Sequence, residues 1–298
     1  MNYLVTGATG FIGRKLVGYL LAGGHSVNYL ARQRSRTMDS RAAFFCWEPG
    51  ESPPLNAVPR LDAIIHLAGE PVAQRWTAEV KERIRSSRVE GTRNLVAAIA
   101  GLKHKPSVLV SASAVGYYGD RGDEILAESS QAGNDFLATV CVHWEQEALK
   151  AREAGLRTVP VRIATVLGRE GGALPRMIRP FQLGLGGKFG TGRQWMSWVH
   201  VDDLVNLLMF AAVTPQLDGP LNGSSPNPVT NADFTNTLAR ALHRPAFFVA
   251  PRFALRLALG EMSDFLFTSS RVLPAAAQQA GFRFAHPVLE EALASVLH

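Results

Sequence analysis

The chain begins with the stretch Asn2-Tyr3-Leu4-Val5-Thr6-Gly7-Ala8-Thr9-Gly10-Phe11-Ile12-Gly13, in which a short apolar run leads into a glycine-rich turn and an amphipathic segment. This order predicts a strand, a tight turn and a helix. Backbone N–H groups and the N-terminus of a helix can approach a pyrophosphate closely at such a turn, where a side chain at Gly10 would occupy the space of the phosphates. The stretch therefore predicts a dinucleotide site. The alternative is a tight turn that needs its glycines only for packing.

The composition is that of a folded chain with a large core. The 298 residues are 47% hydrophobic and 19% charged, which suits one large domain or a domain with an added lobe. No apolar run approaches the roughly 20 residues that a membrane span needs, and no secretion signal is recognisable. Cys46 and Cys141 do not make a disulfide framework. We therefore expect a cytoplasmic protein.

The formal net charge of +6 is modest for this length, and the lysines and arginines are scattered. There is no basic tail and no basic–aromatic stripe, so we expect neither nucleic acid nor a membrane as a partner. An anionic small molecule explains the excess better. The arginines that would suit a polar or anionic substrate are Arg162, Arg176, Arg179 and Arg193.

The first half of the chain alternates strand and helix patterns. Strands are expected at residues 3–6, 26–30, 62–69, 107–113 and 158–163, and helices at 11–22, 78–100 and up to about 155. Such alternation predicts an α/β fold with a doubly wound parallel sheet of the Rossmann type.

Beyond residue 166, glycines and prolines crowd the range 168–192, which predicts a loop-rich lobe. Residues 199–213 predict a short strand and a helix with Asp202 or Asp203 as its N-cap. The domain boundaries expected from these changes are a Rossmann domain over 1–166, to which 199–222 return, and a smaller, mostly helical C-terminal substrate lobe over 167–198 and 223–298.

The choice of cofactor is indicated by a missing acid. NAD sites usually place Asp or Glu about 20 residues beyond the glycines, on the ribose 2′-hydroxyl, but no acidic residue lies between Gly13 and Met38. The corresponding segment reads Ala31-Arg32-Gln33-Arg34-Ser35-Arg36. A guanidinium fork binds a 2′-phosphate well, so Arg32 favours NADP(H) over NAD, unless this is only a solvated basic loop.

Several motifs together resemble the extended short-chain dehydrogenase/reductase superfamily. They are the turn of residues 6–13, the segment His66-Leu67-Ala68-Gly69 and the segment Val199-His200-Val201-Asp202-Asp203. Glu70-Pro71, Arg75-Trp76, Trp144-Glu145 and the ranges 111–119, 180–187 and 281–284 are similar to one atypical branch of the NAD-dependent epimerase/dehydratase superfamily. That branch comprises sugar-nucleotide epimerase-like proteins of largely unknown activity.

The resemblance implies a Rossmann domain, a C-terminal substrate lobe and an NADP(H) site. The expected cofactor-binding residues are Gly7, Thr9, Gly10, Phe11, Ile12, Gly13, Ala31, Arg32, Leu67, Ala68, Gly69 and Arg88, with Val166 near the nicotinamide. The expected partner is a small molecule, for which a nucleotide sugar is one candidate. Dimers are common among such relatives, which makes a homodimer a candidate assembly.

The usual proton-transfer pair of the superfamily is missing. That pair is Tyr-x-x-x-Lys on a helix, where the Lys cation favours the tyrosinate and the phenol exchanges a proton with the substrate. None of the five tyrosines has a lysine four residues later. Counted back from Glu145, the pair would fall at Leu137 and Cys141, which cannot replace it.

The remaining catalytic candidates each have a plainer interpretation. Ser111 or Ser113 could be the usual serine, and Tyr117 or Tyr118 could donate the proton or simply pack a loop. Other candidates with structural alternatives are Glu70 and His200 as bases, and Trp195, Trp198 and Arg193 as a substrate surface. Scattered histidines predict no metal site, and Cys141 is expected in the core.

These features predict an NADP(H)-dependent oxidoreductase or epimerase-like enzyme that acts on a polar small molecule. Hydride would pass between the nicotinamide and a hydroxyl or carbonyl carbon, because the cofactor carries the difficult chemistry. The missing Tyr-x-x-x-Lys pair keeps a second hypothesis open, in which the chain is a non-catalytic NADP(H)-binding sensor or interaction protein.

Overall fold

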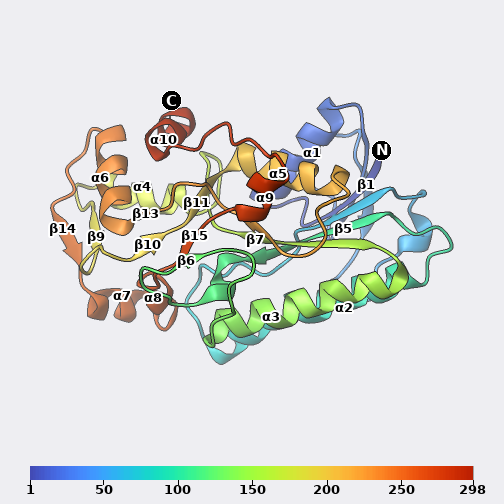
Figure 1. The fold of residues 1–298 in the computed structure, drawn as a ribbon, viewed down its shortest axis with the longest axis horizontal. Helices are drawn as coiled ribbons and strands as arrows, with labels where there is room; N and C mark the ends of the chain where they lie inside the picture. The colour runs from blue at the N-terminus through green and yellow to red at the C-terminus, as the bar shows by residue number, and fades with distance from the viewer. Residues whose placement is uncertain (298) are drawn as a thin grey trace.

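The computed structural model describes residues 1–297, and its centre is a parallel sheet of seven strands (Figure 1). The strand order is β12-β7-β5-β4-β1-β2-β3. The bounds are β1 (Asn2–Thr6), β2 (Ser26–Ala31), β3 (Ala43–Cys46), β4 (Ala63–His66), β5 (Val108–Ala114), β7 (Arg157–Ile163) and β12 (Leu221–Gly223). The order reverses beside β1, so the carboxyl ends of β1 and β4 open a crevice at the switch point. The predicted Rossmann-type α/β fold is confirmed.

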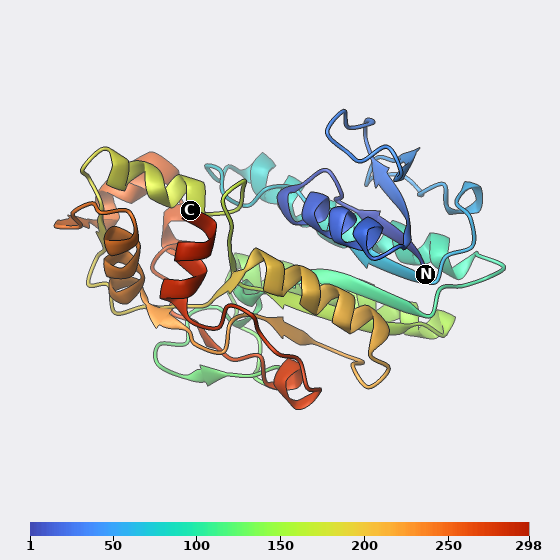
Figure 2. The same cartoon turned by 90° about the horizontal axis from the view of Figure 1, so that it is seen from above.

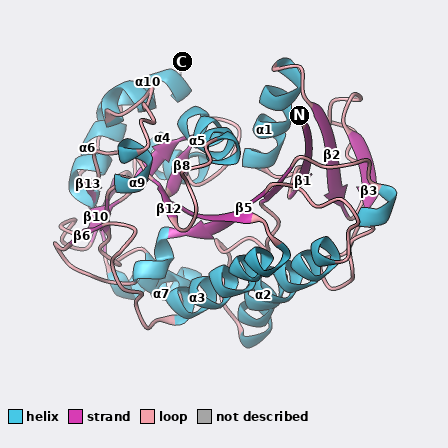
Figure 3. Ribbon diagram, turned by 45° about the vertical axis from the view of Figure 1, so that its right-hand side comes forward, coloured by secondary structure: helices cyan, strands magenta, loops and turns pink. Residues whose placement is uncertain are grey.

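Helices cover both faces of this sheet (Figures 2 and 3). One face carries α1 (Phe11–Ala22) and α5 (Val201–Val213), and the other carries α2 (Ala78–Ala100) and α3 (Phe136–Leu149). Because strand side chains alternate between faces, Tyr3 and Val5 enter the core beneath α1, while Leu4 enters the core beneath α2. The helix predicted over residues 78–100 has the bounds of α2.

The C-terminal lobe is built from short helices and two-stranded pairs. The helices are α4 (Leu174–Gln182), α6 (Asn231–Ala241), α7 (Arg252–Leu259), α8 (Met262–Phe265) and α10 (Leu289–Leu297). The strand pairs are β8 (Thr165–Leu167) with β11 (Trp198–His200), β9 (Gly187–Phe189) with β14 (Phe248–Ala250), β10 (Trp195–Met196) with β13 (Val229–Thr230), and β6 (Ile125–Leu126) with β15 (Arg271–Val272). Trp198, Phe234, Leu238 and Leu293 fill the core of the lobe.

One C-terminal segment lies outside this lobe. Helix α9 (Ala275–Gln279) packs against β12, and Ala277 is buried in the core of the Rossmann domain. The ring of Phe282 lies 5.3 Å from that of Phe210 on α5. The range 223–298 expected for the lobe therefore includes a stretch that returns to the sheet, because its apolar residues are buried there.

The N-cap expected for α5 is wrong. The cap is His200, whose Nδ1 accepts a hydrogen bond from the backbone N–H of Asp202. Asp203 is buried and accepts instead from the backbone N–H groups of Ala285 and His286. Its carboxylate fixes the C-terminal chain against α5, so the sequence pattern identified an acid with another task. Among residues 1–297, no helix is long and apolar enough to cross a membrane.

Candidate functional site

The glycine turn lies between β1 and α1 at the carboxyl edge of the sheet. Gly7 has φ +68°, and a Cβ there would lie 2.6 Å from the carbonyl carbon of Leu67, so only glycine lets the two crossing loops approach. A Cβ at Gly10 would meet only the carbonyl oxygen of Gly7, at 3.2 Å. Gly10 borders a cleft, so the absence of a side chain there leaves space for a ligand, whereas packing within the fold does not require a glycine at this position.

The N-terminus of α1 has no capping side chain and no acidic residue in its first turn. By contrast, Thr77 caps α2 and Asp135 caps α3 through side-chain oxygens that accept backbone N–H groups. The first N–H groups of a helix need an acceptor, and the helix dipole favours an anion there. The turn therefore fits a pyrophosphate, with Gly10 providing the close approach.

A buried histidine holds the loop opposite this turn. His66 Nδ1 lies 2.6 Å from Thr6 Oγ1, and His66 Nε2 lies 2.9 Å from Thr92 Oγ1. Thr6 Oγ1 also accepts the backbone N–H of Ala68, at 3.2 Å. Burial lowers the pKa of His66 to about 4, so its ring is neutral near pH 7. The network fixes the loop of residues 67–69 against the glycine turn.

A cleft of about 460 Å³ opens between the glycine turn and this loop. The expected cofactor-binding residues that line it are Gly7, Thr9, Gly10, Ala31, Arg32, Leu67, Ala68 and Gly69. The lining residues that sequence reasoning missed are Leu30, Trp47, Glu48, Pro49, Gly50, Pro71, Arg83, Ser86, Ser87 and Glu90. The apolar run of residues 43–46 could have predicted the contribution of residues 47–50. This run forms β3, which pairs with β2, so the residues that follow it reach the cleft.

Arg32 and Glu48 both line the cleft at the end of β2 and β3. Arg32 is exposed and has no ion pair among the described residues. An acid, Glu48, thus lines the same cleft as Arg32, although no acidic residue lies between Gly13 and Met38. Glu48 lies further beyond Gly13 in the sequence than the roughly 20 residues at which NAD sites usually place their acid, so the sequence pattern did not identify it.

Five expected cofactor residues do not line this cleft. They are Phe11, Ile12, Gly13, Arg88 and Val166. The ring of Phe11 packs under the loop after β8, where Cβ atoms at Gly171 and Gly172 would crowd it at 2.7 and 3.3 Å. Phe11, which follows the glycine turn, thus contacts the loop of residues 168–172 that leads into the lobe.

Arg88 supports the loop that carries Gly69. Its guanidinium donates to the backbone carbonyls of Glu70, at 2.9 Å, and Ile84, at 3.1 Å, and lies 5.1 Å from the ring centre of Trp144. Burial lowers the pKa of Arg88. A Cβ at Gly69 would lie 3.2 Å from Arg88 Cζ, so the guanidinium packs directly against the loop at Gly69.

A buried polar network occupies the carboxyl ends of β5, β7 and β12. Arg162 forms a bidentate pair with Glu145, with both N–O distances at 2.8 Å. Ser113 Oγ donates to Glu145 Oε1 at 2.6 Å, and the hydroxyl of Tyr118 accepts from Arg162 and lies 2.7 Å from Asn222 Oδ1. Tyr118 is fully buried, and this burial raises its pKa to about 12. Ser113 and Tyr118 therefore use their hydroxyls within the network.

Tyr117 differs from Tyr118. Its side chain is half-buried, and its hydroxyl has no hydrogen-bond partner among the described residues. The guanidinium carbon of Arg162 lies 3.4 Å from its ring centre. Of the candidate proton donors Tyr117, Tyr118 and Ser113, only Tyr117 is partly exposed and has a hydroxyl without a partner among the described residues, although it does not line the cofactor cleft.

The positions of the missing Tyr-x-x-x-Lys pair face the same region. Leu137 lies against Gly116, where a Cβ would be 3.4 Å from Leu137 Cβ. Cys141 is buried beside Ser113, and burial raises the pKa of its thiol to about 12. An apolar residue and a neutral thiol thus occupy these places, and Cys141 is in the core as expected.

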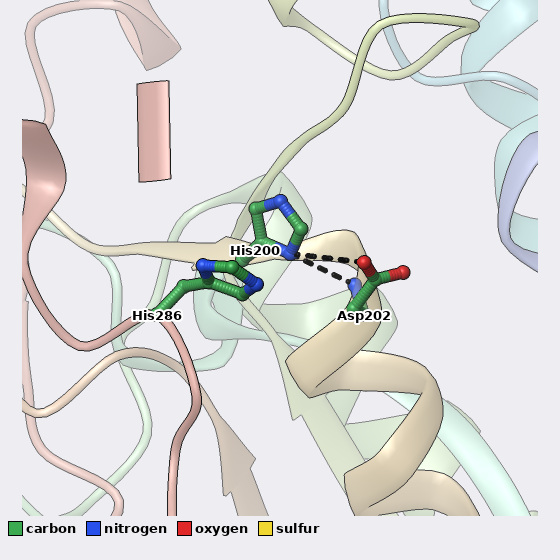
Figure 4. Close-up of side chains that lie close together, drawn as sticks. All are labelled: His200, Asp202 and His286. Atoms are coloured by element: carbon green, nitrogen blue, oxygen red, sulfur yellow. Dashed lines mark hydrogen bonds and ion pairs between the residues drawn. The ribbon is translucent and has the colours of Figure 1, made fainter. Parts of the chain in front are cut away.

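His200, Asp202 and His286 bring ligand-type atoms within 4.8 Å of one another (Figure 4). His200 and Asp202 already have partners, since His200 caps α5, its Nε2 faces Ser295 Oγ at 3.2 Å, and Asp202 forms an ion pair with Lys15. Burial and the neighbouring His286 lower the pKa of His200 to about 4. The arrangement fits a structural role for His200 at the junction with the C-terminal chain.

Three of the six tryptophans and arginines proposed for the substrate are used by the fold. Trp198 is fully buried and donates to the carbonyl of Asn227, so a stacking role for it is wrong. Trp195 donates to Asp123 and has Arg271 over its ring. The guanidinium of Arg162 is paired with the buried carboxylate of Glu145 and cannot bind a substrate anion. Glu70 remains at the cleft, where its carboxylate accepts from Gln74.

The parallel sheet, the uncapped glycine turn and the cleft at the switch point define a nucleotide-cofactor-binding protein of the Rossmann class. A family model described as "NAD dependent epimerase/dehydratase family" matches residues 3–222, and one described as "Domain of unknown function (DUF1731)" matches residues 250–296. The chain belongs to the NAD dependent epimerase/dehydratase family.

Whole-length relatives support this assignment. The chain is 41% identical to "Epimerase family protein SDR39U1 homolog, chloroplastic" of Arabidopsis thaliana, with 100% of this chain and 87% of the relative covered. It is 40% identical to "Epimerase family protein YfhF" of Bacillus subtilis, with 100% and 98% covered. Because the plant relative is named as chloroplastic, a cytoplasmic location stays a prediction.

A solved structure of the same kind is that of human epimerase family protein SDR39U1 (isoform 2) with NADPH. Its TM-score is 0.90 at 33% identity, and 99% of each chain is covered. The human protein is therefore similar to this chain in both the Rossmann domain and the lobe, and its structure contains NADPH.

Proposed function

We propose that this protein is an NADP(H)-dependent oxidoreductase or epimerase whose substrate binds between the glycine turn and the C-terminal lobe. The observation that carries the proposal is the uncapped N-terminus of α1 behind Gly10, which faces a cleft that also contains Arg32. The NADPH in the human relative supports the same choice of cofactor. The residues proposed to hold it are those named from the sequence, with Trp47 and Glu48 added from the cleft.

Each part of the cleft has a task in this proposal. The first N–H groups of α1 bind the pyrophosphate, and Arg32 binds the 2′-phosphate through its guanidinium fork. Glu48 lines the same cleft as Arg32, so in this proposal the balance between the two side chains influences the preference between NADP(H) and NAD(H). Phe11 and Val166, which pack on the loop of residues 168–172, position the nicotinamide end next to the lobe.

When bound, the cofactor supplies or accepts a hydride at C4 of the nicotinamide. The chain then needs one group that exchanges a proton with the substrate oxygen. Tyr117 is the proposed donor, because its side chain is half-buried and its hydroxyl has no partner among the described residues, whereas Tyr118 and Ser113 are held in the Arg162 network. Arg162 positions Tyr117 by packing against its ring.

The test of the proposal is cofactor binding followed by hydride transfer. We expect the purified chain to bind NADPH more tightly than NADH, by fluorescence titration. The variant Arg32→Ala should weaken NADPH binding by about tenfold or more and leave NADH binding unchanged, because a charge-assisted fork contributes about 1.5–3 kcal/mol. Arg34→Ala is the matched control, since Arg34 is exposed on the same loop and does not line the cleft.

The second candidate function is a non-catalytic NADP(H)-binding sensor. Leu137 and Cys141 at the positions of the missing pair favour it. In that case both redox forms should bind, and a broad panel of carbonyl compounds and nucleotide sugars should give no oxidation of NADPH. Turnover of any member that Tyr117→Phe abolishes would support the enzyme instead.

A further inference from the structure

The C-terminal lobe contains a second cavity, of about 640 Å³, that is distinct from the cofactor cleft. It lies among α4, α6, α7 and the strand pair β9–β14, at the end of the molecule far from the N-terminus (Figure 1). Cavities of roughly 300–1,000 Å³ are typical of small-molecule sites. This cavity is large enough for a ligand, and none of the expected cofactor-binding residues lines it.

The lining of this cavity is almost entirely apolar. Of the 21 described residues that line it, only Arg176, Asn231 and Thr235 have polar side chains. The amide oxygen of Asn231 is already used, because it accepts the backbone N–H of Phe189 at 2.8 Å. A sugar hydroxyl or a diphosphate placed here would lose hydration without gaining partners, and each such group is costly to bury.

One cation stands at the cavity. Arg176 on α4 is exposed, and its guanidinium donates to the backbone carbonyl of Ala73 at 2.5 Å. Within residues 1–297, Arg176 has no carboxylate partner. A single guanidinium beside an apolar chamber is complementary to a ligand with one anionic group and a long apolar part.

The cavity reaches the loop that contacts Phe11 and Val166. Gly172 and Ala73 line the cavity. A Cβ at Gly172 would lie 2.8 Å from the carbonyl oxygen of Val166 and 3.3 Å from the ring of Phe11. A ligand that fills the cavity therefore has one end next to the residues proposed to position the nicotinamide.

We propose that this cavity binds an amphiphile, namely a small molecule with a long aliphatic chain and one carboxylate or similar anion, which lies against Arg176. The inference rests on the proposed function, because it names the substrate class of the same enzyme as aliphatic and not as a nucleotide sugar. It replaces the expectation of a polar substrate, whose arginines were Arg162, Arg176, Arg179 and Arg193. Arg162 is buried in its pair with Glu145, and only Arg176 lines the chamber.

Calorimetric titration of the full chain with straight-chain carboxylates from octanoate to hexadecanoate tests the proposal. Each added methylene should tighten binding by about fourfold until the cavity is full, after which the affinity should level off. Uridine diphosphate glucose should neither bind in the cavity nor compete with dodecanoate. Absence of any dependence on chain length would overturn the proposal.

Helix α7 offers a matched pair of variants. Leu255 lines the cavity, whereas Leu257 lies two residues further on and is 80% exposed. Leu255→Arg should abolish dodecanoate binding, and Leu257→Arg should leave it unchanged. Equal losses in both variants would show adsorption to the outer apolar surface and overturn the proposal. So would a concentration-dependent dimer that both variants disrupt, because a second copy would then be the occupant.

Helix α4 offers a second pair. Arg176→Gln should weaken dodecanoate binding by about tenfold without affecting its methyl ester, while Arg179→Gln, which alters an exposed residue outside the cavity, should affect neither. An unchanged affinity of Arg176→Gln for dodecanoate would remove the anion from the proposal and overturn it. Binding of carboxylates, with no oxidation of NADPH by any carbonyl compound tested, long-chain oxo carboxylates included, would defeat the proposed function alone. Hydride transfer on other substrates, with no carboxylate binding, would defeat this inference alone.

Discussion

The guanidinium of Arg162 packs on the ring of Tyr117, with its central carbon 3.4 Å from the ring centre, while its fork is held by Glu145. The arginine cannot turn away without breaking that buried pair, so the ring of Tyr117 rests on a fixed support. The adjacent Tyr118 is bonded to the same arginine through its hydroxyl and is fully buried. Two neighbouring tyrosines thus differ: Tyr117 is half-buried with a hydroxyl that has no partner among the described residues, and Tyr118 lies within the core.

Tyr117→Phe should lower turnover by about 100-fold or more and leave NADPH affinity unchanged, because it removes the proposed proton donor and no structural hydrogen bond. Tyr118→Phe should instead lower the free energy of unfolding by about 1–3 kcal/mol, because Arg162 and Asn222 lose their partner. Turnover on a carbonyl substrate and urea denaturation of both variants provide the comparison. Full activity of Tyr117→Phe would remove Tyr117 from the mechanism.

Gly10→Ala should weaken NADPH binding by about tenfold or more while the protein remains folded. The added methyl group would project at the cleft, where it blocks the approach of the phosphates but meets only one backbone atom. Gly18→Ala is the control within the same helix, since its Cβ would have nothing within 4 Å. That variant should bind NADPH normally and gain about 0.5–1 kcal/mol of stability. Equal affinity of the two variants would show that Gly10 does not face the phosphates.

Glu145→Gln should lower the free energy of unfolding by about 3–5 kcal/mol, because it leaves the buried charge of Arg162 without its counter-ion. The exposed pair of Arg240 and Glu290 is the internal comparison. Glu290→Gln should cost less than about 1 kcal/mol. Urea denaturation of both variants at pH 7 measures the difference, and similar costs would mean that the Glu145 pair contributes no more than a surface pair.

Stability should fall as the pH is lowered from about 6.5 to about 4. His66 and His200 have pKa values of about 4 in the folded protein, below the ordinary value of 6.5, because both are buried. Within this window the unfolded chain binds protons that the folded chain does not, so the stabilisation is present above pH 6.5 and is lost below it. For His66 alone the loss is about 3 kcal/mol.

Urea midpoints at several pH values measure this slope, and the C2 proton of His66 in an NMR titration reports the site directly. We expect that proton to show no titration above pH 5. His66→Asn should flatten the dependence on pH. A normal titration near pH 6.5 would mean that the Thr6–His66–Thr92 network is open to water.

The sequence by itself determined the Rossmann domain, the glycine turn and the family, because these depend on local periodicity and on glycines that a tight turn requires. Residues 2–13 and the helix over 78–100 were predictable for this reason, and the missing Tyr-x-x-x-Lys pair could be read directly. The same reasoning selected Arg32, which lines the cleft.

Tertiary structure alone decided which polar residues are free to act. Glu48 reaches the cleft only because β3 pairs with β2, and Arg162 is removed from the substrate only because Glu145 lies opposite it on α3. The apolar lining around Arg176 is assembled from segments between residues 73 and 266, so no local sequence pattern predicts it. Contacts between distant segments set burial and pairing, and these determine whether a charged side chain binds a ligand or stabilises the fold.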